Sequence, residues 1–187
     1  MAEQFAKNFG VPVDWQPYLL RPDAPREGWA LPDRIKAMKN RPDNPLNARA
    51  KQLGLTLVER EWIPNSRRAL AANEHIRKQG LEALHAYHSA VNVRYWSKGE
   101  DLSQLDVLEG AAKDAGLDTR GLREAVENDT FEQTIDDSIA KAHAMGIHAV
   151  PTYVFFDGEK PIGAIQGAQE YAVFERAAAQ LGLKKHS

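Results

Sequence analysis

Histidine is the first residue type to consider for chemistry in this sequence, because the chain has six histidines and no cysteine. Histidine titrates near a pKa of about 6.5, so it can act as a general acid or base and as a metal ligand. His85 and His88 lie three residues apart on a predicted helix, which would place both on one face. The sequence offers no evident third ligand for this pair. We therefore interpret the pair as packing or hydrogen-bonding residues and predict no metal site.

Two further histidines, His143 and His148, flank Gly146 just before a proline at the mouth of an apolar strand. His148 would lie close to any ligand bound at Val150, where it could donate or accept a proton. A surface or helix-capping role is the alternative that the pattern favours. His148 is thus the one candidate catalytic residue, and no catalytic residue is assigned with certainty.

The lack of cysteine excludes disulfides, thiolate metal sites and cysteine nucleophiles from the chemistry of this chain. A formal net charge of −2 argues against a general nucleic-acid binder, which needs clustered Lys and Arg. No apolar run approaches the roughly 18 residues of a membrane span. The opening MAEQFAKNFG has neither the basic nor the apolar region of a signal peptide. We expect a cytoplasmic protein with no membrane or nucleic-acid partner.

The hydrophobic pattern predicts the elements that position these residues. A helix with Phe5 and Phe9 on one face ends at Gly10, and a short strand follows over 11–20. From Asn44 to Met145 the pattern is helical. The end of the chain then predicts, in order, a strand over 152–156, a turn over 157–160, a strand over 161–165 and a helix over 169–181.

Within the helical block, Asn65 and Ser66 precede a predicted helix that begins at Arg67. Short polar side chains at this position usually accept hydrogen bonds from the first free N–H groups of a helix. We interpret Asn65 and Ser66 as capping residues and Arg67 as a solvated charge. Trp62, Trp96 and Tyr153 are predicted to be core residues or walls of a groove.

An ordered series of segments resembles the FrnE-like branch of DsbA-type thioredoxin proteins. The segments are WQPYLLRPDAPREG, NSRRALAANEHIRKQG, YWSKGEDLSQLDVLEGAAKDAGLD, AKAHAMGIHAVPTYVFF and IQGAQ. The related 2-hydroxychromene-2-carboxylate isomerases and kappa-class glutathione transferases share the helical insertion and the VPT element. The resemblance covers roughly residues 5 to 181. It implies an α/β, thioredoxin-like fold of the DsbA type with a large all-helical insertion.

The same resemblance implies a division into an incomplete thioredoxin-like domain, 1–30 with 146–187, and a helical insertion domain, 31–145. Members of the family carry a first strand and a Cys-x-x-Cys helix ahead of the region that this sequence covers. We expect both to be missing here, except for the end of that helix. The strand around Trp15 could shift to pair with the hairpin, a partner could donate a strand, or residues ahead of Met1 in the natural protein could fill the gap. We expect a homodimer that covers either the gap in the sheet or the exposed helical block.

The family also implies a role for Val150, Pro151 and Thr152. In the thioredoxin plan this proline is cis, and the backbone of the preceding residue pairs with an extended peptide or with glutathione. The element could instead serve only to shape the fold. In the isomerase branch an asparagine near the active site corresponds to Asn65, which makes Asn65 a second candidate ligand-binding residue.

Three functions remain open at this point. The first is a protein-disulfide oxidoreductase of the DsbA/FrnE lineage, and the second is a glutathione-dependent isomerase or transferase. The third is a redox-inactive binding module. Because this chain has no sulfur nucleophile, we expect a member of the first lineage with the chemistry of the third. Its ligand would be a thiol-containing peptide or glutathione, and no cofactor is assigned.

Overall fold

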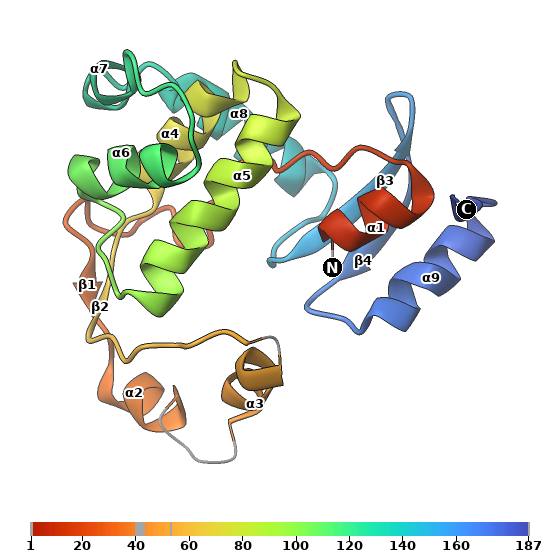
Figure 1. Cartoon of the computed structure of the whole chain (residues 1–187), viewed down its shortest axis with the longest axis horizontal. Helices are drawn as coiled ribbons and strands as arrows, with labels where there is room; N and C mark the ends of the chain where they lie inside the picture. The colour runs from red at the N-terminus through yellow and green to blue at the C-terminus, as the bar shows by residue number, and fades with distance from the viewer. Residues whose placement is uncertain (1, 40–43, 53, 187) are drawn as a thin grey trace. The chain divides into compact units, whose positions relative to one another are not determined.

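The computed structural model describes residues 2–39, 44–52 and 54–186, which form two compact units. The first unit comprises Met1–Leu20 with Ser138–Ser187, and the second comprises Arg21–Asp137. Figure 1 shows the elements of both units as a ribbon. The chain is a mixed α/β protein that is mostly helical, and its described part holds two small sheets. The domain division expected from the family, at residues 30 and 145, stays a prediction.

The first unit is built from a hairpin and the helices beside it. Its elements are α1 (Ala2–Phe9), the C-terminal part of α8 (Glu132–Ala144), β3 (Thr152–Asp157), β4 (Lys160–Gln166) and α9 (Tyr171–Gln180). The strands run antiparallel, with Thr152 opposite Gln166, and the turn between them holds Gly158 at a φ of 60°. Only glycine adopts such a φ without steric cost. The predicted hairpin and its two flanking helices are confirmed.

One apolar cluster holds this unit together. Phe5 and Phe9 on α1 pack with Phe174 on α9 and with Phe155 on β3, and ring centroids lie 4.7 Å apart for Phe5–Phe9 and 5.7 Å apart for Phe5–Phe155. Phe174 is only 2% exposed. The spacing of four residues between Phe5 and Phe9 places both rings on the same side of α1. The helices therefore attach to the hairpin through aromatic side chains.

The strand predicted over 11–20 does not form. The backbone of residues 11–19 is described and belongs to no strand. The alternation of Val11, Val13 and Trp15 is typical of a strand, but a strand also needs a neighbour that supplies ladder hydrogen bonds. Pro12 and Pro17 have no N–H to contribute to such a ladder. The prediction was wrong because a periodic pattern does not by itself provide a partner.

The second unit consists mainly of helices. They are α2 (Asp33–Lys39), α3 (Pro45–Gln52), α4 (Arg67–Arg77), α5 (Leu81–Asn92), the π-helix η1 (Val93–Ser97), α6 (Leu105–Asp114), α7 (Leu122–Glu127) and the first part of α8. Their fully buried side chains include Ile76, Leu84, Tyr87, Leu108, Leu122 and Ile135. The mainly helical pattern predicted for this region is confirmed.

The expectation of an all-helical insertion needs a correction. β2 (Trp62–Ile63) lies inside the predicted insertion and pairs antiparallel with β1 (Trp29–Ala30). Pro64 follows β2, and the residue before a proline is driven to an extended conformation. Trp62 is 44% exposed, and its indole N–H donates to the carbonyl of Glu27 at 3.0 Å. Trp62 is therefore not a core residue.

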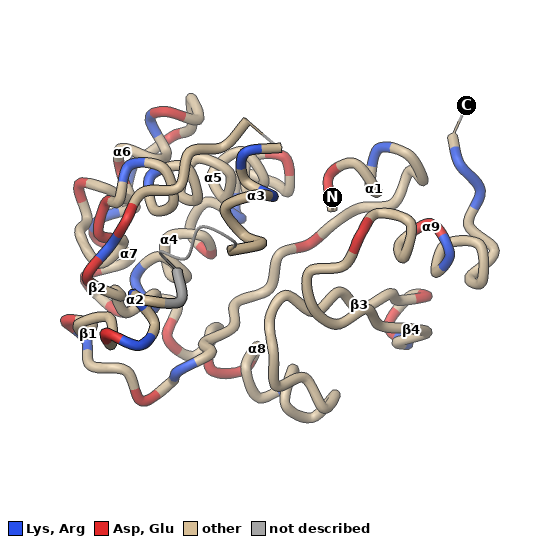
Figure 2. The backbone as a smooth tube through the Cα atoms, turned by 90° about the horizontal axis from the view of Figure 1, so that it is seen from below, with Lys and Arg blue, Asp and Glu red and all other residues tan. Residues whose placement is uncertain are grey.

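Charged residues of both signs are interspersed along the backbone, as Figure 2 shows, in keeping with a net charge of −2. Among the residues that the structure describes, no helix has the length and hydropathy needed to cross a bilayer.

Candidate functional site

Four of the sequence-predicted site residues lie in one loop of the first unit. This loop joins α8 to β3 and contains His148, Val150 and Pro151, and Thr152 is the first residue of β3. Asn65 belongs to the second unit, where it precedes α4. The proline loop is thus a local feature of the first unit, and Asn65 belongs to the second.

The loop is held by hydrogen bonds at both ends. α8 is closed by Gly146, at a φ of 74°, and the N–H of Ile147 donates back to the carbonyl of Ala142 at 2.9 Å. Beyond the proline, the carbonyl of Pro151 accepts from the N–H of Gly167 at 2.8 Å. The hydroxyl of Thr152 donates to the carbonyl of Ala149 at 2.7 Å. The expected cis peptide bond between Val150 and Pro151 is present.

Val150 lies between these hydrogen bonds, and its own backbone groups make none within the described part of the chain. Neither its N–H nor its carbonyl has a hydrogen-bond partner among residues 2–39, 44–52 and 54–186. The residue is 48% exposed, so solvent reaches it. A donor and an acceptor on the same extended residue are what a further strand needs in order to pair with it. The loop can therefore present one hydrogen-bonding pair to an extended ligand.

Two histidines and a tyrosine lie near this loop. The rings of His143 and His148 are stacked, with centroids 5.4 Å apart, and both side chains are exposed. The hydroxyl of Tyr18 lies 3.4 Å from Nε2 of His143 and 3.4 Å from the carbonyl oxygen of Ile147. His148 and Val150 lie two residues apart in the same loop, and the catalytic role of His148 stays a prediction. The exposed position of His148 agrees equally well with the alternative prediction of a surface or helix-capping role.

Tyr18 is a site neighbour that the sequence reasoning missed. It lies 125 residues from His143 in the chain, and no spacing pattern connects the two positions. The N-terminal segment passes close to α8 because the carbonyl of Pro17 accepts a hydrogen bond from the hydroxyl of Ser138 at 3.0 Å. Tyr18 lies near the imidazole of His143 only because the N-terminal segment follows this path.

Tyr153 is half-buried and packs against the apolar cluster of the first unit. Its ring packs edge-on against Phe174, with centroids 4.9 Å apart. Burial raises the pKa of Tyr153 above its ordinary value, because it disfavours the phenolate.

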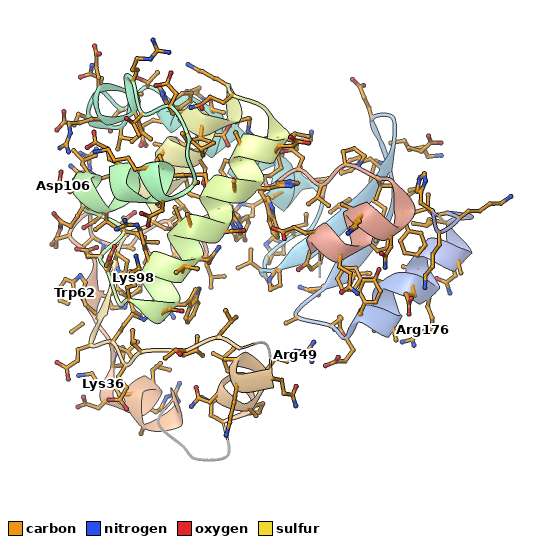
Figure 3. All side chains as sticks on the ribbon, in the orientation of Figure 1. Lys36, Arg49, Trp62, Lys98, Asp106 and Arg176 are labelled. Carbon is orange, nitrogen blue, oxygen red and sulfur yellow. The ribbon has the colours of Figure 1, made fainter. Side chains whose placement is uncertain are left out.

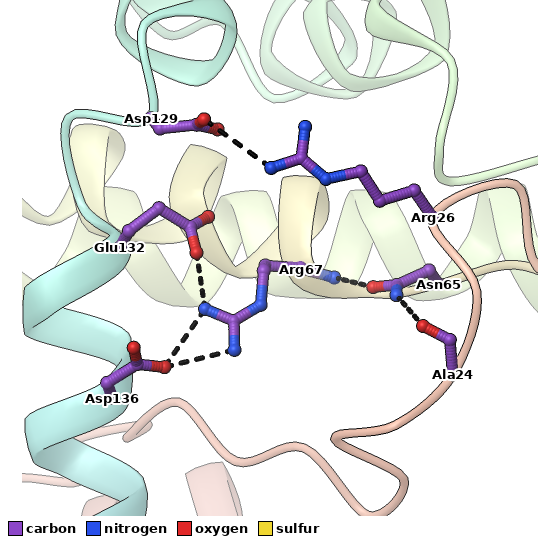
Figure 4. A network of polar contacts seen from close by, with 7 residues as sticks. All are labelled: Ala24, Arg26, Asn65, Arg67, Asp129, Glu132 and Asp136. Carbon is purple, nitrogen blue, oxygen red and sulfur yellow. Dashed lines mark hydrogen bonds and ion pairs between the residues drawn. The ribbon is translucent and has the colours of Figure 1, made fainter.

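Asn65 has a structural position. Its side-chain oxygen accepts from the N–H of Arg67 at 2.9 Å, and its amide nitrogen donates to the carbonyl of Ala24 at 2.9 Å (Figure 4). The same nitrogen also lies 3.2 Å from the carbonyl oxygen of Pro25. The predicted capping of α4 is confirmed for Asn65, whereas Ser66 makes no side-chain capping bond. Asn65 also ties the loop at residues 24–25 to the start of α4. Its role in ligand binding stays a prediction.

The remaining histidine pair does not assemble a metal centre in the part of the chain that is described. His88 is half-buried, and the side-chain amide of Asn92 lies 3.3 Å from its Nδ1. No cluster of three or more His, Cys, Asp or Glu suited to a metal ion occurs among the described residues.

The comparison with known proteins agrees with this geometry. Residues 1–179 match the family described as the DSBA-like thioredoxin domain. This chain belongs to that family. One relative is the "Uncharacterized protein YwbO" of Bacillus subtilis (strain 168), which is 25% identical over 184 residues. The match covers 98% of this chain and 88% of that protein. The family-level resemblance drawn from the sequence motifs is therefore confirmed, in a DSBA-like chain that contains no cysteine.

Proposed function

We propose that this DSBA-like protein is a redox-inactive relative of the FrnE-like branch that binds an extended thiol peptide, or glutathione, at Val150. The proposal includes no dithiol exchange by the chain itself. The observation that carries it is Val150, a residue that is 48% exposed and whose backbone N–H and carbonyl have no hydrogen-bond partner among the described residues.

Strand addition supplies the physical basis for this binding. In an antiparallel pair, two residues that face each other exchange both of their backbone hydrogen bonds. An extended ligand that does so with Val150 gains affinity from the main chain alone, and its side chains add specificity. The bonds of Pro151 to Gly167 and of Thr152 to Ala149 hold the loop before the ligand arrives. Such preorganisation lowers the entropy lost on binding.

The absence of cysteine excludes thiol–disulfide exchange by this chain. Thiol–disulfide exchange begins with attack by a thiolate, and this chain has no cysteine to supply one. A thiol on the ligand would therefore remain unchanged by the protein.

The alternative, a glutathione-dependent isomerase or transferase, receives less support from the same residues. That function would require the Asn65 side chain to face a substrate. Here its oxygen and nitrogen both bond to backbone groups of the protein. We therefore favour binding over catalysis.

Two variants at one position test the proposal. Val150→Pro removes the backbone N–H, whereas Val150→Ala keeps it and shortens the side chain. Calorimetry with reduced glutathione, and with a short capped peptide that has a central cysteine, should show binding to the wild type and to V150A. Loss of a hydrogen bond should weaken binding to V150P by about tenfold.

Two results would contradict the proposal. One is the absence of saturable binding of either ligand to the wild-type chain, and the other is equal affinity of V150P and V150A. If V150P does not fold, the amide resonance of Val150 in the wild-type protein serves as the readout. That resonance should move on titration, and a stationary resonance with bound ligand would exclude the site.

A further inference from the structure

A cavity of about 390 Å³ lies within the second unit, and none of the predicted site residues lines it. Its wall is apolar where it contains Leu57, Val58 and Trp96, and it contains two cations, Lys36 and Arg60. Pockets of this size accommodate small organic ligands, which commonly contact an apolar wall and a few well-placed polar groups. The question is which ligand the polar groups of this cavity would recognise.

Arg60 is held in the wall by two aromatic rings. Its guanidinium carbon lies 3.5 Å from the centroid of Tyr95 and 4.3 Å from that of Trp96. Both rings come from the π-helix η1, and the N–H of Val58 donates to the carbonyl of Trp96 at 3.0 Å. Stacking on aromatic faces fixes the plane of a guanidinium. Arg60 is therefore oriented before any ligand binds.

One terminal nitrogen of this guanidinium lacks an acceptor. Nη1 of Arg60 is buried and has no hydrogen-bond partner in the described part of the chain. No carboxylate of the described residues forms an ion pair with Arg60 either, although Glu59 and Glu61 also line the cavity. Leaving a buried donor on a charged group without an acceptor destabilises the folded protein.

Arg60 cannot remove this destabilisation by losing a proton from its guanidinium. Burial lowers the pKa of Arg60, and the neighbouring Tyr95 opposes this shift. Even so, a guanidinium stays protonated in proteins. The unmet requirement is therefore an oxygen acceptor, and an anionic oxygen satisfies it better than a neutral one because charge-assisted hydrogen bonds are stronger.

We propose that this cavity binds a small organic monocarboxylate with an apolar body, anchored by the guanidinium of Arg60, which lines the cavity and has no carboxylate partner among the described residues. The apolar body contacts Leu57, Val58 and Trp96. This inference does not depend on the function proposed for the Val150 loop, since it rests on other residues.

The charges in the wall select a monoanion. Lys36 lies 3.6 Å from Glu61, whose side chain is 87% exposed, so these two charges largely offset each other. Glu59 is also exposed and adds a negative charge to the lining. A phosphate or dicarboxylate would bring a second negative charge toward these acids, which is unfavourable. A monocarboxylate has one negative charge, which Arg60 pairs with, and brings no second charge toward Glu59 and Glu61.

Hexanoate, hexanamide and inorganic phosphate are the probes that test this inference by calorimetry on the full chain. Hexanamide has the same apolar body without the charge, and phosphate has the charge without the body. We expect hexanoate to bind at least about tenfold more tightly than either, since a hydrogen bond to a charged group contributes most of the difference. Equal affinity for hexanoate and hexanamide, or tighter binding of phosphate, would overturn the inference.

The anchor is tested with Arg60→Gln, and Arg176→Gln on the exposed face of α9 is the matched control (Figure 3). R60Q should lose about tenfold in hexanoate affinity, and R176Q should bind as the wild type does. Equal affinities of R60Q and R176Q would exclude Arg60 as the anchor. If R60Q does not fold, the side-chain Nε resonance of Arg60 and the indole resonance of Trp96 in the wild-type protein replace it. Both should shift on addition of hexanoate, and unshifted resonances at saturation would exclude the cavity.

Discussion

Arg67 and Asp136 are joined by two hydrogen bonds, in which both terminal guanidinium nitrogens donate to one carboxylate oxygen at 3.0 Å (Figure 4). Glu132, one turn earlier on α8, accepts a further bond from the same guanidinium. Partial burial opposes the charge on Arg67, but the bonds to Asp136 and Glu132 outweigh it and raise the pKa of Arg67. The first residue of α4 is thereby fastened to α8.

Replacing Arg67 with methionine should destabilise the protein by roughly 1–2 kcal/mol, because a network of charged hydrogen bonds is lost. Glu132 and Asp136 would also repel each other at their spacing of four residues on a helix. Urea unfolding followed by circular dichroism measures the change. Arg26→Met is the control, since Arg26 is 85% exposed and lies 3.6 Å from Asp129. An exposed pair of this kind contributes no more than about 1 kcal/mol, so equal losses in R67M and R26M would contradict the expectation.

Truncating Phe174 to alanine should lower the free energy of unfolding of the first unit by about 3–5 kcal/mol, because it opens a cavity among buried rings. Phe174 is 2% exposed and contacts both Tyr153 and Phe5. Phe156→Ala, at a ring that is 44% exposed, is the matched change outside the core. Similar midpoints of urea unfolding for F174A and F156A would disprove the assignment of this core.

Asp118 should titrate with a pKa of about 2, since hydrogen bonds from Arg120 hold its carboxylate in the charged form. A pKa that is depressed by folding adds stability above the unfolded value near about 4, and this contribution disappears as the pH falls toward the folded value. NMR titration of the side-chain carboxyl measures the midpoint. In Arg120→Gln the midpoint should rise toward the ordinary range, although the backbone N–H of residue 120 still donates to Asp118. An unchanged midpoint would show that the Arg120 side chain is not the cause.

Insulin reduction by the purified chain in the presence of dithiothreitol should proceed at the rate of the reagent alone. The reason is chemical, because exchange needs a thiolate and the chain has none. A DSBA-like protein that retains a Cys-x-x-Cys motif serves as the positive control. An acceleration above the reagent rate would be inconsistent with a redox-inactive protein.

Sedimentation at micromolar concentration should give the mass of a homodimer, which we propose on the basis of the open hairpin. Among the described residues β3 and β4 pair only with each other, so each has one edge without a neighbouring strand. Phe156 and Ile162 on these strands are 44% and 42% exposed. Open edges and exposed apolar side chains favour association. A single monomeric species across the concentration range would remove this expectation.

Local signals in the sequence were enough to predict much of the fold. The helix that ends at Gly10, the hairpin from Thr152 to Gln166 and the helical region between them follow from periodicity and from glycine at turns. The strand predicted over 11–20 failed for a reason that no local pattern contains. Ladder hydrogen bonds come from a neighbour, and the neighbour is a property of the assembled chain.

The features of the candidate sites likewise fall into those that the sequence predicts and those that depend on the tertiary structure. The sequence by itself determined that the chain contains no sulfur nucleophile and that a proline introduces β3, because composition and order need no folding. Only the tertiary structure decided that Tyr18 reaches His143, that Arg67 joins α4 to α8 and that Nη1 of Arg60 is buried without an acceptor in the described chain. Burial and long-range contact depend on how distant segments pack, and residue type alone does not specify this.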